Sequence, residues 1–469
     1  MYIDDTITAI ATAPGEGGIG IIRISGPKSL EVAESIFKSN SGKKISEYKA
    51  RTLIYGKIVD KRIDTDNNSY TESVIDEVLV AYMKGPNSYT AEDVIEINCH
   101  GGIVSVKKIL ELVLSKDVRL ADRGEFTKRA FLNGRIDLSQ AEAVIDIINA
   151  KTSKSHEVAQ GQLEGSLSKK IKDLRFKVTE LLAQIEVAID FPEEDIEFIT
   201  YKELKEGATN LRYQIEKLYD SSESGKILRE GLKTVIVGKP NVGKSSLLNL
   251  ILGEKRAIVT DIPGTTRDVI EEFVNIRGIP VRIIDTAGIR ETEDVVEKIG
   301  VEKSKESIQS ADLVITVLDY SNDISDEDIE ILKTVDKSKT IVLLNKTDLD
   351  KKIDIAQIDK YVNTDNIIEI SALNNIGIEK LEEKIEKLVY KGNVKNNSEI
   401  VISNSRHKDA LEKSLRAMED AINSINQALP LDFVEVDLKN VWDYLGYING
   451  DTVKEDLLDT IFSNFCIGK

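Results

Sequence analysis

The feature that most constrains the fold of this chain is the run Gly238-Lys239-Pro240-Asn241-Val242-Gly243-Lys244-Ser245-Ser246. Apolar residues flank it, at positions 234–237 before the run and 247–250 after it. This order predicts a buried strand, a glycine-rich turn and the start of a helix. The spacing G-x-x-x-x-G-K-S lets backbone N–H groups wrap a β-phosphate, while Lys244 reaches the β/γ oxygens and the Ser245 hydroxyl binds Mg²⁺. The sequence therefore predicts a phosphate-binding loop within an α/β domain.

Two later motifs indicate which base the nucleotide carries. Asn345-Lys346-Thr347-Asp348 follows the apolar residues 341–344, and Ser371-Ala372-Leu373 follows residues 367–370. A carboxylate at Asp348 can accept hydrogen bonds from both N1–H and the 2-amino group of guanine, which adenine does not offer. The second motif would support the base with a main-chain N–H. We therefore predict that the nucleotide is GTP rather than ATP.

Two further motifs are expected to close around the γ-phosphate. Asp285-Thr286-Ala287-Gly288 follows the apolar residues 281–284, so that Asp285 can hold Mg²⁺ through water and the Gly288 N–H can meet the γ-phosphate. The stretch 260–268 is the expected first switch, with Thr266 as the second Mg²⁺ ligand. The predicted GTP contacts are Asn241, Val242, Gly243, Lys244, Ser245, Ser246, Thr260, Asp261, Ile262, Pro263, Gly264, Thr265, Thr266, Asp285, Thr286, Ala287, Gly288, Asn345, Lys346, Asp348, Ser371, Ala372 and Leu373.

The group that orients the attacking water is not fixed by the motifs. Small signalling GTPases use a glutamine directly after the D-x-x-G turn, and this chain has Ile289 there, which has no polar side-chain atom. Either hydrolysis is very slow or another group acts, and Glu291, Glu293 and Glu297 lie just beyond. For any single glutamate, the more common alternative is a place on a solvated loop or helix surface. The Asn241 carboxamide can coordinate a monovalent cation, which would neutralise charge as an arginine finger does.

Composition limits the other classes of function. A chain of 469 residues is expected to form two to four domains. Its net charge of −18 means that any RNA would have to bind a local basic face. Two distant cysteines, Cys99 and Cys466, suit a reducing cytoplasm and form no disulfide framework. We expect no signal peptide, because residues 1–5 lack a basic segment followed by an apolar core, and no membrane span, because no apolar run approaches 18 residues.

The first part of the chain has a mixed pattern typical of an α+β domain. Residues 60–72 are polar and predict a surface loop. Residues 15–20 match the dinucleotide fingerprint G-x-G-x-x-G, but a strand pattern follows instead of a helix, so we interpret them as a glycine-rich turn. The expected strands are 7–13, 20–24, 52–58 and 75–82, and the expected helices are 30–37 and 104–114.

Helical periodicity occurs on both sides of the nucleotide-binding segment. Apolar residues recur every three or four positions from Leu163 to Ile185, before Pro192, and again from Leu411 to Leu429, before Pro430. One helical domain that contains an inserted GTP-binding domain explains both stretches, and two unrelated arms are the alternative. The expected domains are 1–122, 123–226 (first helical part), 227–393 (GTPase) and 394–469 (second helical part).

Across its whole length the chain resembles the MnmE family, also called TrmE, of GTPases that modify the wobble uridine of certain tRNAs. The resemblance includes all the GTPase motifs and the ending Phe465-Cys466-Ile467-Gly468-Lys469. It also rests on residues 13–20, 23–26, 88–93, 100–102 and 124–133. It implies an α+β folate-binding-like domain, a discontinuous α-helical domain and an inserted α/β P-loop (Ras-like) GTPase domain.

The resemblance implies a folate site in the amino-terminal domain. The family binds a one-carbon tetrahydrofolate, of 5-formyl or methylene type, through residues that match Arg23, Glu96, Arg135 and Lys469. Arg135 stands where the family has a lysine, and its planar fork replaces a point donor. The family's carboxyl-terminal cysteine matches Cys466, whose part is either catalytic or that of a packed thiol.

The resemblance also assigns ligands in the GTPase domain. The Mg²⁺ ligands match Ser245 and Thr266, and the water-orienting glutamate matches Glu297, which would be catalytic together with Lys244. The K⁺ ligands match Asn241, Thr260, Ile262 and Thr265.

The function implied by the resemblance is that of a cytoplasmic, K⁺-stimulated GTPase. It would form a homodimer through the amino-terminal domains, and its GTPase domains would pair when GTP and K⁺ bind. With the flavin-dependent partner MnmG (GidA) it would install a carboxymethylaminomethyl or aminomethyl-type group at C5 of uridine 34 in certain tRNAs. The alternative is a regulatory or ribosome-associated GTPase switch without modification chemistry.

Overall fold

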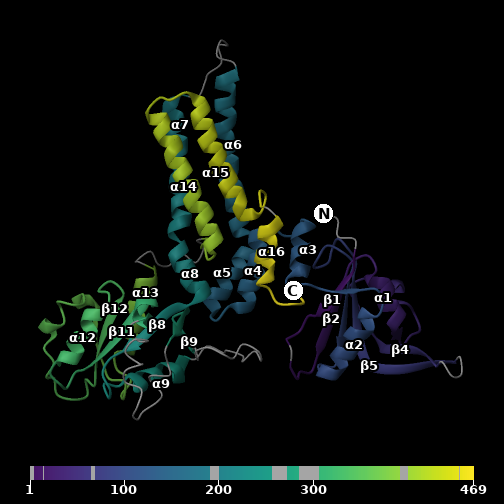
Figure 1. Ribbon diagram of the computed structural model, residues 1–469, viewed down its shortest axis with the longest axis horizontal. Helices are drawn as coiled ribbons and strands as arrows, with labels where there is room; N and C mark the ends of the chain where they lie inside the picture. The colour runs from purple at the N-terminus through teal and green to yellow at the C-terminus, as the bar shows by residue number, and fades with distance from the viewer. Residues whose placement is uncertain are drawn as a thin grey trace. The chain divides into compact units, whose positions relative to one another are not determined.

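The computed structural model describes residues 5–13, 15–64, 69–190, 200–255, 272–284, 306–390, 400–453 and 455–469 (Figure 1). The chain divides into two compact units. Unit 1 comprises Met1–Ile145 and Asn449–Lys469, and unit 2 comprises Asp146–Ile448. The domain boundaries expected from the sequence stay a prediction. No helix among the described residues is long and apolar enough to cross a membrane.

Unit 1 is built on a seven-stranded sheet with the order β3-β4-β5-β6-β2-β1-β7. Its buried face packs against two helices, α1 (Ser29–Ile36) and α2 (Ile103–Leu114), which bury Ile22 and Ile24 of β2. Because side chains alternate along a strand, Arg23 lies on the opposite face. The strands are β1 (Ile7–Ile10), β2 (Gly20–Ser25), β3 (Phe37–Ser39), β4 (Leu53–Asp64), β5 (Ser69–Met83), β6 (Val94–Cys99) and β7 (Arg119–Leu120).

The surface loop expected at residues 60–72 is wrong. Strand β4 continues to Asp64 and β5 begins at Ser69, so most of this polar stretch is a two-stranded ribbon. The pairing register continues through Asp60↔Ser73 and Lys61↔Glu72. Backbone pairing and a cross-strand pair of opposite charge, Lys61 and Glu72, hold the two strands together, and neither depends on apolar periodicity, so the sequence pattern does not reveal the ribbon.

The glycine-rich turn before β2 is confirmed, since Gly20 begins a strand and not a helix. The turn lies close to the backbone that follows β6: a Cβ at Gly101 would lie 2.3 Å from the Gly17 carbonyl oxygen, which explains the glycine at position 101. The rest of unit 1 is helical and includes the end of the chain. Helices α3 (Glu125–Leu132), α4 (Leu138–Asn149) and α16 (Glu455–Ser463) contribute a small core with Phe462 and Phe465.

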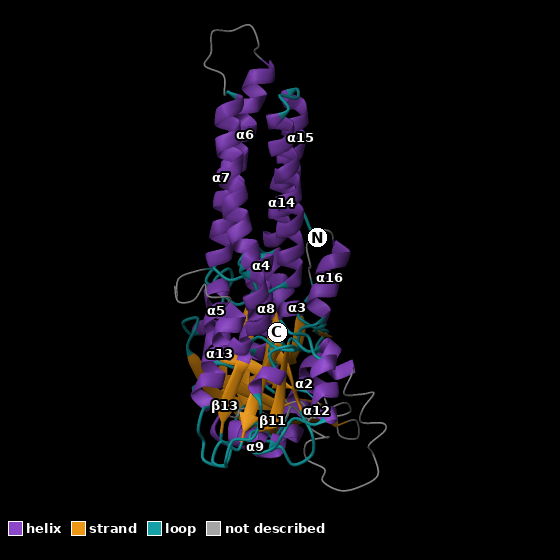
Figure 2. Cartoon of the chain, turned by 90° about the vertical axis from the view of Figure 1, so that its left-hand side faces the viewer, coloured by secondary structure: helices purple, strands orange, loops and turns teal. Residues whose placement is uncertain are grey.

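The long helices of unit 2 lie side by side (Figures 1 and 2). They are α6 (Ser166–Asp190), α7 (Tyr201–Asp220), α14 (Ser405–Asn426) and α15 (Leu431–Asn449). One core joins residues before and after the GTP-binding segment, from Leu167 to Leu218 and from Ile402 to Ile448. The discontinuous helical domain is therefore confirmed, and the alternative of two unrelated arms is wrong.

The apolar stripe expected to begin at Leu163 is interrupted. Leu163 ends a separate helix, α5 (Ser153–Leu163), and Gly165 has a φ of +84° before α6 begins. The spacing of apolar residues continues across this break, so periodicity alone does not reveal it. Helix α8 (Ser222–Glu230) then leads into the GTP-binding segment.

The inserted segment is an α/β domain with the strand order β13-β12-β11-β8-β10-β9. All adjacent strands are parallel except β9, which is antiparallel to β10. Its five parallel strands end at one edge of the sheet, where ligands of such folds bind. The elements are β8 (Leu232–Val237), α9 (Lys244–Lys255), β9 (Glu272–Ile276), β10 (Ile279–Ile283), β11 (Leu313–Asp319), α12 (Asp326–Thr334), β12 (Thr340–Asn345), β13 (Ile367–Ile370) and α13 (Ile378–Tyr390).

Candidate functional site

The predicted phosphate loop joins the end of β8 to the start of α9. Gly238 and Gly243 have φ values of +149° and +101°, a region that residues with a side chain rarely adopt. A Cβ at Gly238 would lie 2.4 Å from the Val317 carbonyl oxygen. At Gly243 it would lie 2.1 Å from the Asn345 Nδ2. Both glycines are therefore required for the loop to close against β11 and β12.

Lys244 lies at the centre of this loop. Its Nζ donates hydrogen bonds to the carbonyl oxygens of Gly238 at 2.7 Å and of Lys239 at 2.6 Å. Burial lowers the pKa of Lys244, which is the expected direction for a cation taken out of water. The phosphate of a bound nucleotide would give Lys244 a charged partner. The resulting charge-assisted hydrogen bond would be stronger than the present bonds to carbonyl oxygens. Ser245 follows at the exposed start of α9, where its hydroxyl is the hard oxygen ligand that Mg²⁺ prefers.

The neighbouring Lys239 fixes the outer part of the loop. Its Nζ lies 2.7 Å from the Ser325 hydroxyl and 2.7 Å from an Asp328 carboxylate oxygen at the start of α12. Asn241 is exposed and has a φ of +62°, a conformation that asparagine tolerates better than most residues. Its carboxamide is therefore at the surface of the loop, where it can reach a cation.

Asn345 connects the phosphate loop to the predicted base-binding motifs. Its Nδ2 donates to the Val242 carbonyl at 2.8 Å, and its Oδ1 accepts from the Ala372 N–H at 3.0 Å. Asn345 is buried, with 3% of its surface exposed. Since both polar ends are used within the protein, the residue acts as a brace between the two halves of the site.

Asp348 lies just beyond the end of β12 and is exposed. One carboxylate oxygen accepts a hydrogen bond from the Ser371 hydroxyl at 2.6 Å, which orients the group. Lys346, with a φ of +72°, forms an ion pair with Asp319 at 2.6 Å. Burial by itself would raise the pKa of Asp319, but Lys346 and Ser321 lower it below its usual value. The structure thus brings together the described residues predicted to bind GTP, with Leu373 84% exposed beside them.

Some predicted site residues lie outside the described residues. They are Thr260, Asp261, Ile262, Pro263, Gly264, Thr265, Thr266, Asp285, Thr286, Ala287, Gly288 and the three candidate glutamates Glu291, Glu293 and Glu297.

The four predicted folate residues converge in unit 1. Arg23 on β2 pairs with Glu96 on β6, with N···O distances of 2.9 and 2.8 Å, and donates to the Gly468 carbonyl at 3.2 Å. Lys469 is close enough to this pair for their charges to affect it. Burial and the charge of Arg23 lower the pKa of Lys469, and Glu96 partly opposes them. Arg135 reaches the same place, because it lies over the Tyr89 ring that Arg23 also contacts.

The charge balance of this cluster fits an anionic ligand. Arg23 is paired with Glu96, whereas no carboxylate among the described residues forms a salt bridge with Arg135 or the Lys469 side chain. A ligand with carboxylates, such as a folate, would supply the missing negative charge. Cys466 is nearby in the chain, and its carbonyl accepts from the Gly124 N–H at 3.4 Å. The residue is exposed, which does not fit a packed thiol, and a catalytic part for it stays a prediction.

Sequence reasoning missed Tyr89, which contacts two arginines of this cluster, and a buried ion-pair network around Arg129 in the same unit. Tyr89 lies within residues 88–93, which contribute to the family resemblance, but the resemblance gives it no role in the site. Arg129 is 1% exposed and forms ion pairs with Asp5 at 2.6 Å, Glu125 at 3.0 Å and Glu92 at 3.3 Å. Nothing in the sequence around Arg129 identifies its partners, because Asp5 lies 124 positions away.

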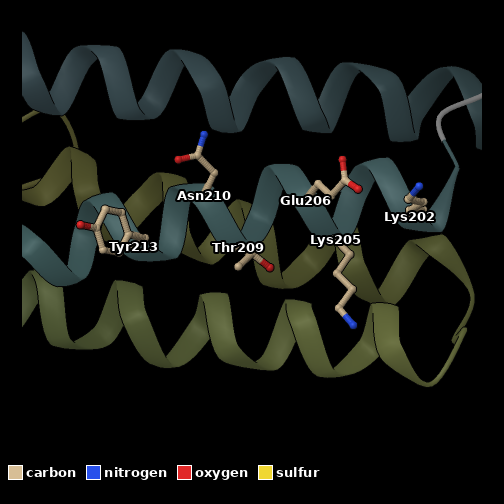
Figure 3. Close-up of a pocket in the computed structure, with 6 residues that line it drawn as sticks. All are labelled: Lys202, Lys205, Glu206, Thr209, Asn210 and Tyr213. Carbon is tan, nitrogen blue, oxygen red and sulfur yellow. The ribbon is translucent and has the colours of Figure 1, made fainter.

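A shallow pocket lies elsewhere, along the exposed face of α7 (Figure 3). Its lining residues are Lys202, Lys205, Glu206, Thr209, Asn210 and Tyr213. None of them is a predicted site residue, so this pocket is separate from the nucleotide and folate clusters.

The fold and the nucleotide site together define the class of P-loop GTP-binding proteins. Two family models then match the chain, "MnmE helical domain" over residues 138–466 and "GTP-binding protein TrmE N-terminus" over residues 6–135. The chain belongs to the MnmE (TrmE) family of tRNA modification GTPases. The family and fold class expected from the sequence are thereby confirmed.

The similar proteins match the chain from end to end. The protein named tRNA modification GTPase MnmE from Clostridioides difficile (strain 630) is 72% identical over 469 residues, which is 100% of both chains. Its counterpart of the same name in Alkaliphilus oremlandii is 56% identical over 100% of both chains. The one in Bacillus subtilis (strain 168) is 52% identical over 99% of this chain and 100% of its own.

Proposed function

We propose that this GTPase acts on the wobble uridine of certain tRNAs and, with a flavin-dependent partner of the MnmG (GidA) type, installs an aminomethyl or carboxymethylaminomethyl-type group at C5 of uridine 34. The supporting observation is the 72% identity over the full length to a protein named tRNA modification GTPase MnmE. Mass analysis of tRNA from cells that lack this chain is the test. We expect uridine 34 without the C5 group, and an unchanged modified uridine would favour a regulatory switch instead.

A one-carbon tetrahydrofolate is the proposed source of the added carbon. Arg23, Glu96, Arg135 and Lys469 would hold it, and their surplus of positive charge supports this assignment. Arg23, Arg135 and Lys469 would bind the ligand's carboxylates, and Glu96, which is itself acidic, would orient Arg23 through their ion pair. We also propose a cytoplasmic location, because both Cys99 and Cys466 are free thiols.

A homodimer formed through the amino-terminal domains is also part of the proposal. Leu53, Tyr55 and Leu79 are 64%, 49% and 39% exposed on the sheet face opposite α1 and α2. The register continues this face from Leu53 through Ala81 and Glu96 to Arg23. Exposed apolar side chains gathered on one sheet face are typical of a protein interface. A second copy of this chain is the proposed occupant.

GTP hydrolysis is proposed to depend on K⁺ held by Asn241 together with Thr260, Ile262 and Thr265. Mg²⁺ would bind Ser245 and Thr266. A bound K⁺ would neutralise negative charge that develops in the transition state, and this requires an ion of the right size. We expect GTP turnover to be at least about tenfold faster in KCl than in NaCl of equal ionic strength. Equal rates in both salts would remove the cation from the mechanism.

Glu297 is the proposed residue that orients the attacking water. We expect Glu297→Ala to leave GTP affinity unchanged and to slow hydrolysis at least tenfold, about 1.4 kcal/mol, because the carboxylate acts only on the water. Single-turnover kinetics and a binding titration would measure the two effects. Glu291→Ala and Glu293→Ala are matched controls with the same charge change. A slow Glu291 or Glu293 variant beside a normal Glu297 variant would reassign the role.

A further inference from the structure

Tyr89 holds a central place in the cationic cluster of unit 1. It lies in the connection between β5 and β6, and two guanidinium groups lie over its ring. The Cζ of Arg23 is 5.2 Å from the ring centroid, and the Cζ of Arg135 is 4.9 Å from it. Both distances are within the range of a cation–π interaction. One aromatic ring therefore contacts two of the four proposed folate ligands.

The connection that carries Tyr89 is held firmly on both sides. The Tyr89 hydroxyl hydrogen-bonds with the Thr127 hydroxyl at 2.9 Å, and Thr127 is fully buried in α3. The next residue, Thr90, is also fully buried, hydrogen-bonds with Ser25 at 2.7 Å and accepts from Asn133 Nδ2 at 2.7 Å. Since these contacts come from β2, α3 and the segment after α3, the ring is a fixed support rather than a surface side chain free to rotate.

The two arginines depend on this ring to different degrees. Arg23 has further contacts with Glu96, with the Gly468 carbonyl and with the Phe126 ring at 5.5 Å. Arg135 is exposed, and among the described residues its side chain has the ring contact with Tyr89 but no hydrogen bond or ion pair. Loss of the ring would therefore free Arg135, while Arg23 would stay in place.

We propose that Tyr89 is a positioning residue that holds the guanidinium plane of Arg135 for an anionic one-carbon folate. This inference rests on the proposed folate function of the cluster. A planar guanidinium can lie on the ring and still present its N–H groups to a carboxylate as a two-pronged donor.

The test is the affinity of the full-length protein for 5-formyltetrahydrofolate, measured by calorimetry. We expect Tyr89→Leu to weaken binding about tenfold, because Arg135 is no longer held. Tyr89→Phe keeps the ring and loses only the hydrogen bond to Thr127, so its affinity should stay within about threefold of the wild type. Thermal unfolding of the full-length variants, followed by circular dichroism, would report whether unit 1 is still folded, because Tyr89 lies in that unit. GTP turnover depends on the nucleotide site in unit 2 and should be unchanged in both variants.

A double-mutant cycle separates positioning from a general structural effect. In an Arg135→Ala background the ring has lost its target, so Tyr89→Leu should then weaken binding by no more than about threefold. An equal tenfold loss in both backgrounds, or no loss in either, would overturn the inference. A Tyr89→Phe variant as weak as Tyr89→Leu would also overturn it. If the wild type does not bind the folate, the folate function itself is wrong.

Discussion

Lys244→Ala is expected to slow GTP hydrolysis by at least 100-fold at saturating nucleotide. The Lys244 ammonium lies inside the phosphate loop, held by the carbonyl oxygens of Gly238 and Lys239. It is therefore in position to stabilise charge on the β/γ oxygens as the bond breaks, and the removal of one such preorganised donor typically costs 10² to 10³ in rate. Phosphate release in Mg²⁺ and K⁺ would measure the effect.

The control for this variant is Lys233→Ala. Lys233 lies near the start of the same strand, β8, at the opposite end from the phosphate loop. The substitution removes the same charge, and we expect turnover to remain within about twofold. A Lys244 variant that hydrolyses GTP as fast as the control would show that this loop is not the phosphate site.

Asp348→Asn is expected to change the base that the protein prefers. The carboxylate would accept hydrogen bonds from N1–H and the 2-amino group of guanine, and an amide presents a donor where one acceptor was. We expect GTP affinity to fall by at least about 100-fold, because a polar group then faces an unmatched partner. Xanthosine triphosphate carries a carbonyl at C2, so it should bind the variant better than GTP does. Competition titrations with both nucleotides would measure this reversal.

Ser371→Ala tests the support of that carboxylate. The Ser371 hydroxyl donates to Asp348 at 2.6 Å, and its loss should weaken GTP binding by about 1 kcal/mol without changing base preference.

The Asp348→Asn variant decides where the base is recognised. If it still prefers GTP over the xanthine nucleotide, the base is recognised elsewhere.

The nucleotide-binding fold and the arrangement of its described motifs could be predicted because their signals are local. Each motif is a short run that directly follows an apolar strand, and parallel strands end at the same edge of a sheet. The brace formed by Asn345 was not predictable, since it joins Val242 and Ala372, which are 103 and 27 positions away. The polar ribbon of β4 and β5 was missed because backbone pairing, not apolar periodicity, holds it.

The folate cluster shows the other limit of sequence reasoning. Arg23 and Gly468 are 445 positions apart, and no spacing rule brings them together. Only the family resemblance named the four residues. The resemblance did not identify Tyr89. Its proposed role depends on two arginines that contact one ring, and only the folded chain brings them together.

The central claim is that GTP hydrolysis by this chain serves tRNA modification. The most direct measurement is mass analysis of uridine 34 in tRNA from cells whose only copy of this protein is either wild type or Lys244→Ala, at equal protein levels. We predict the C5-modified uridine with the wild type and the uridine without its C5 group with the variant. Full modification in cells that carry only the Lys244→Ala protein would contradict the claim.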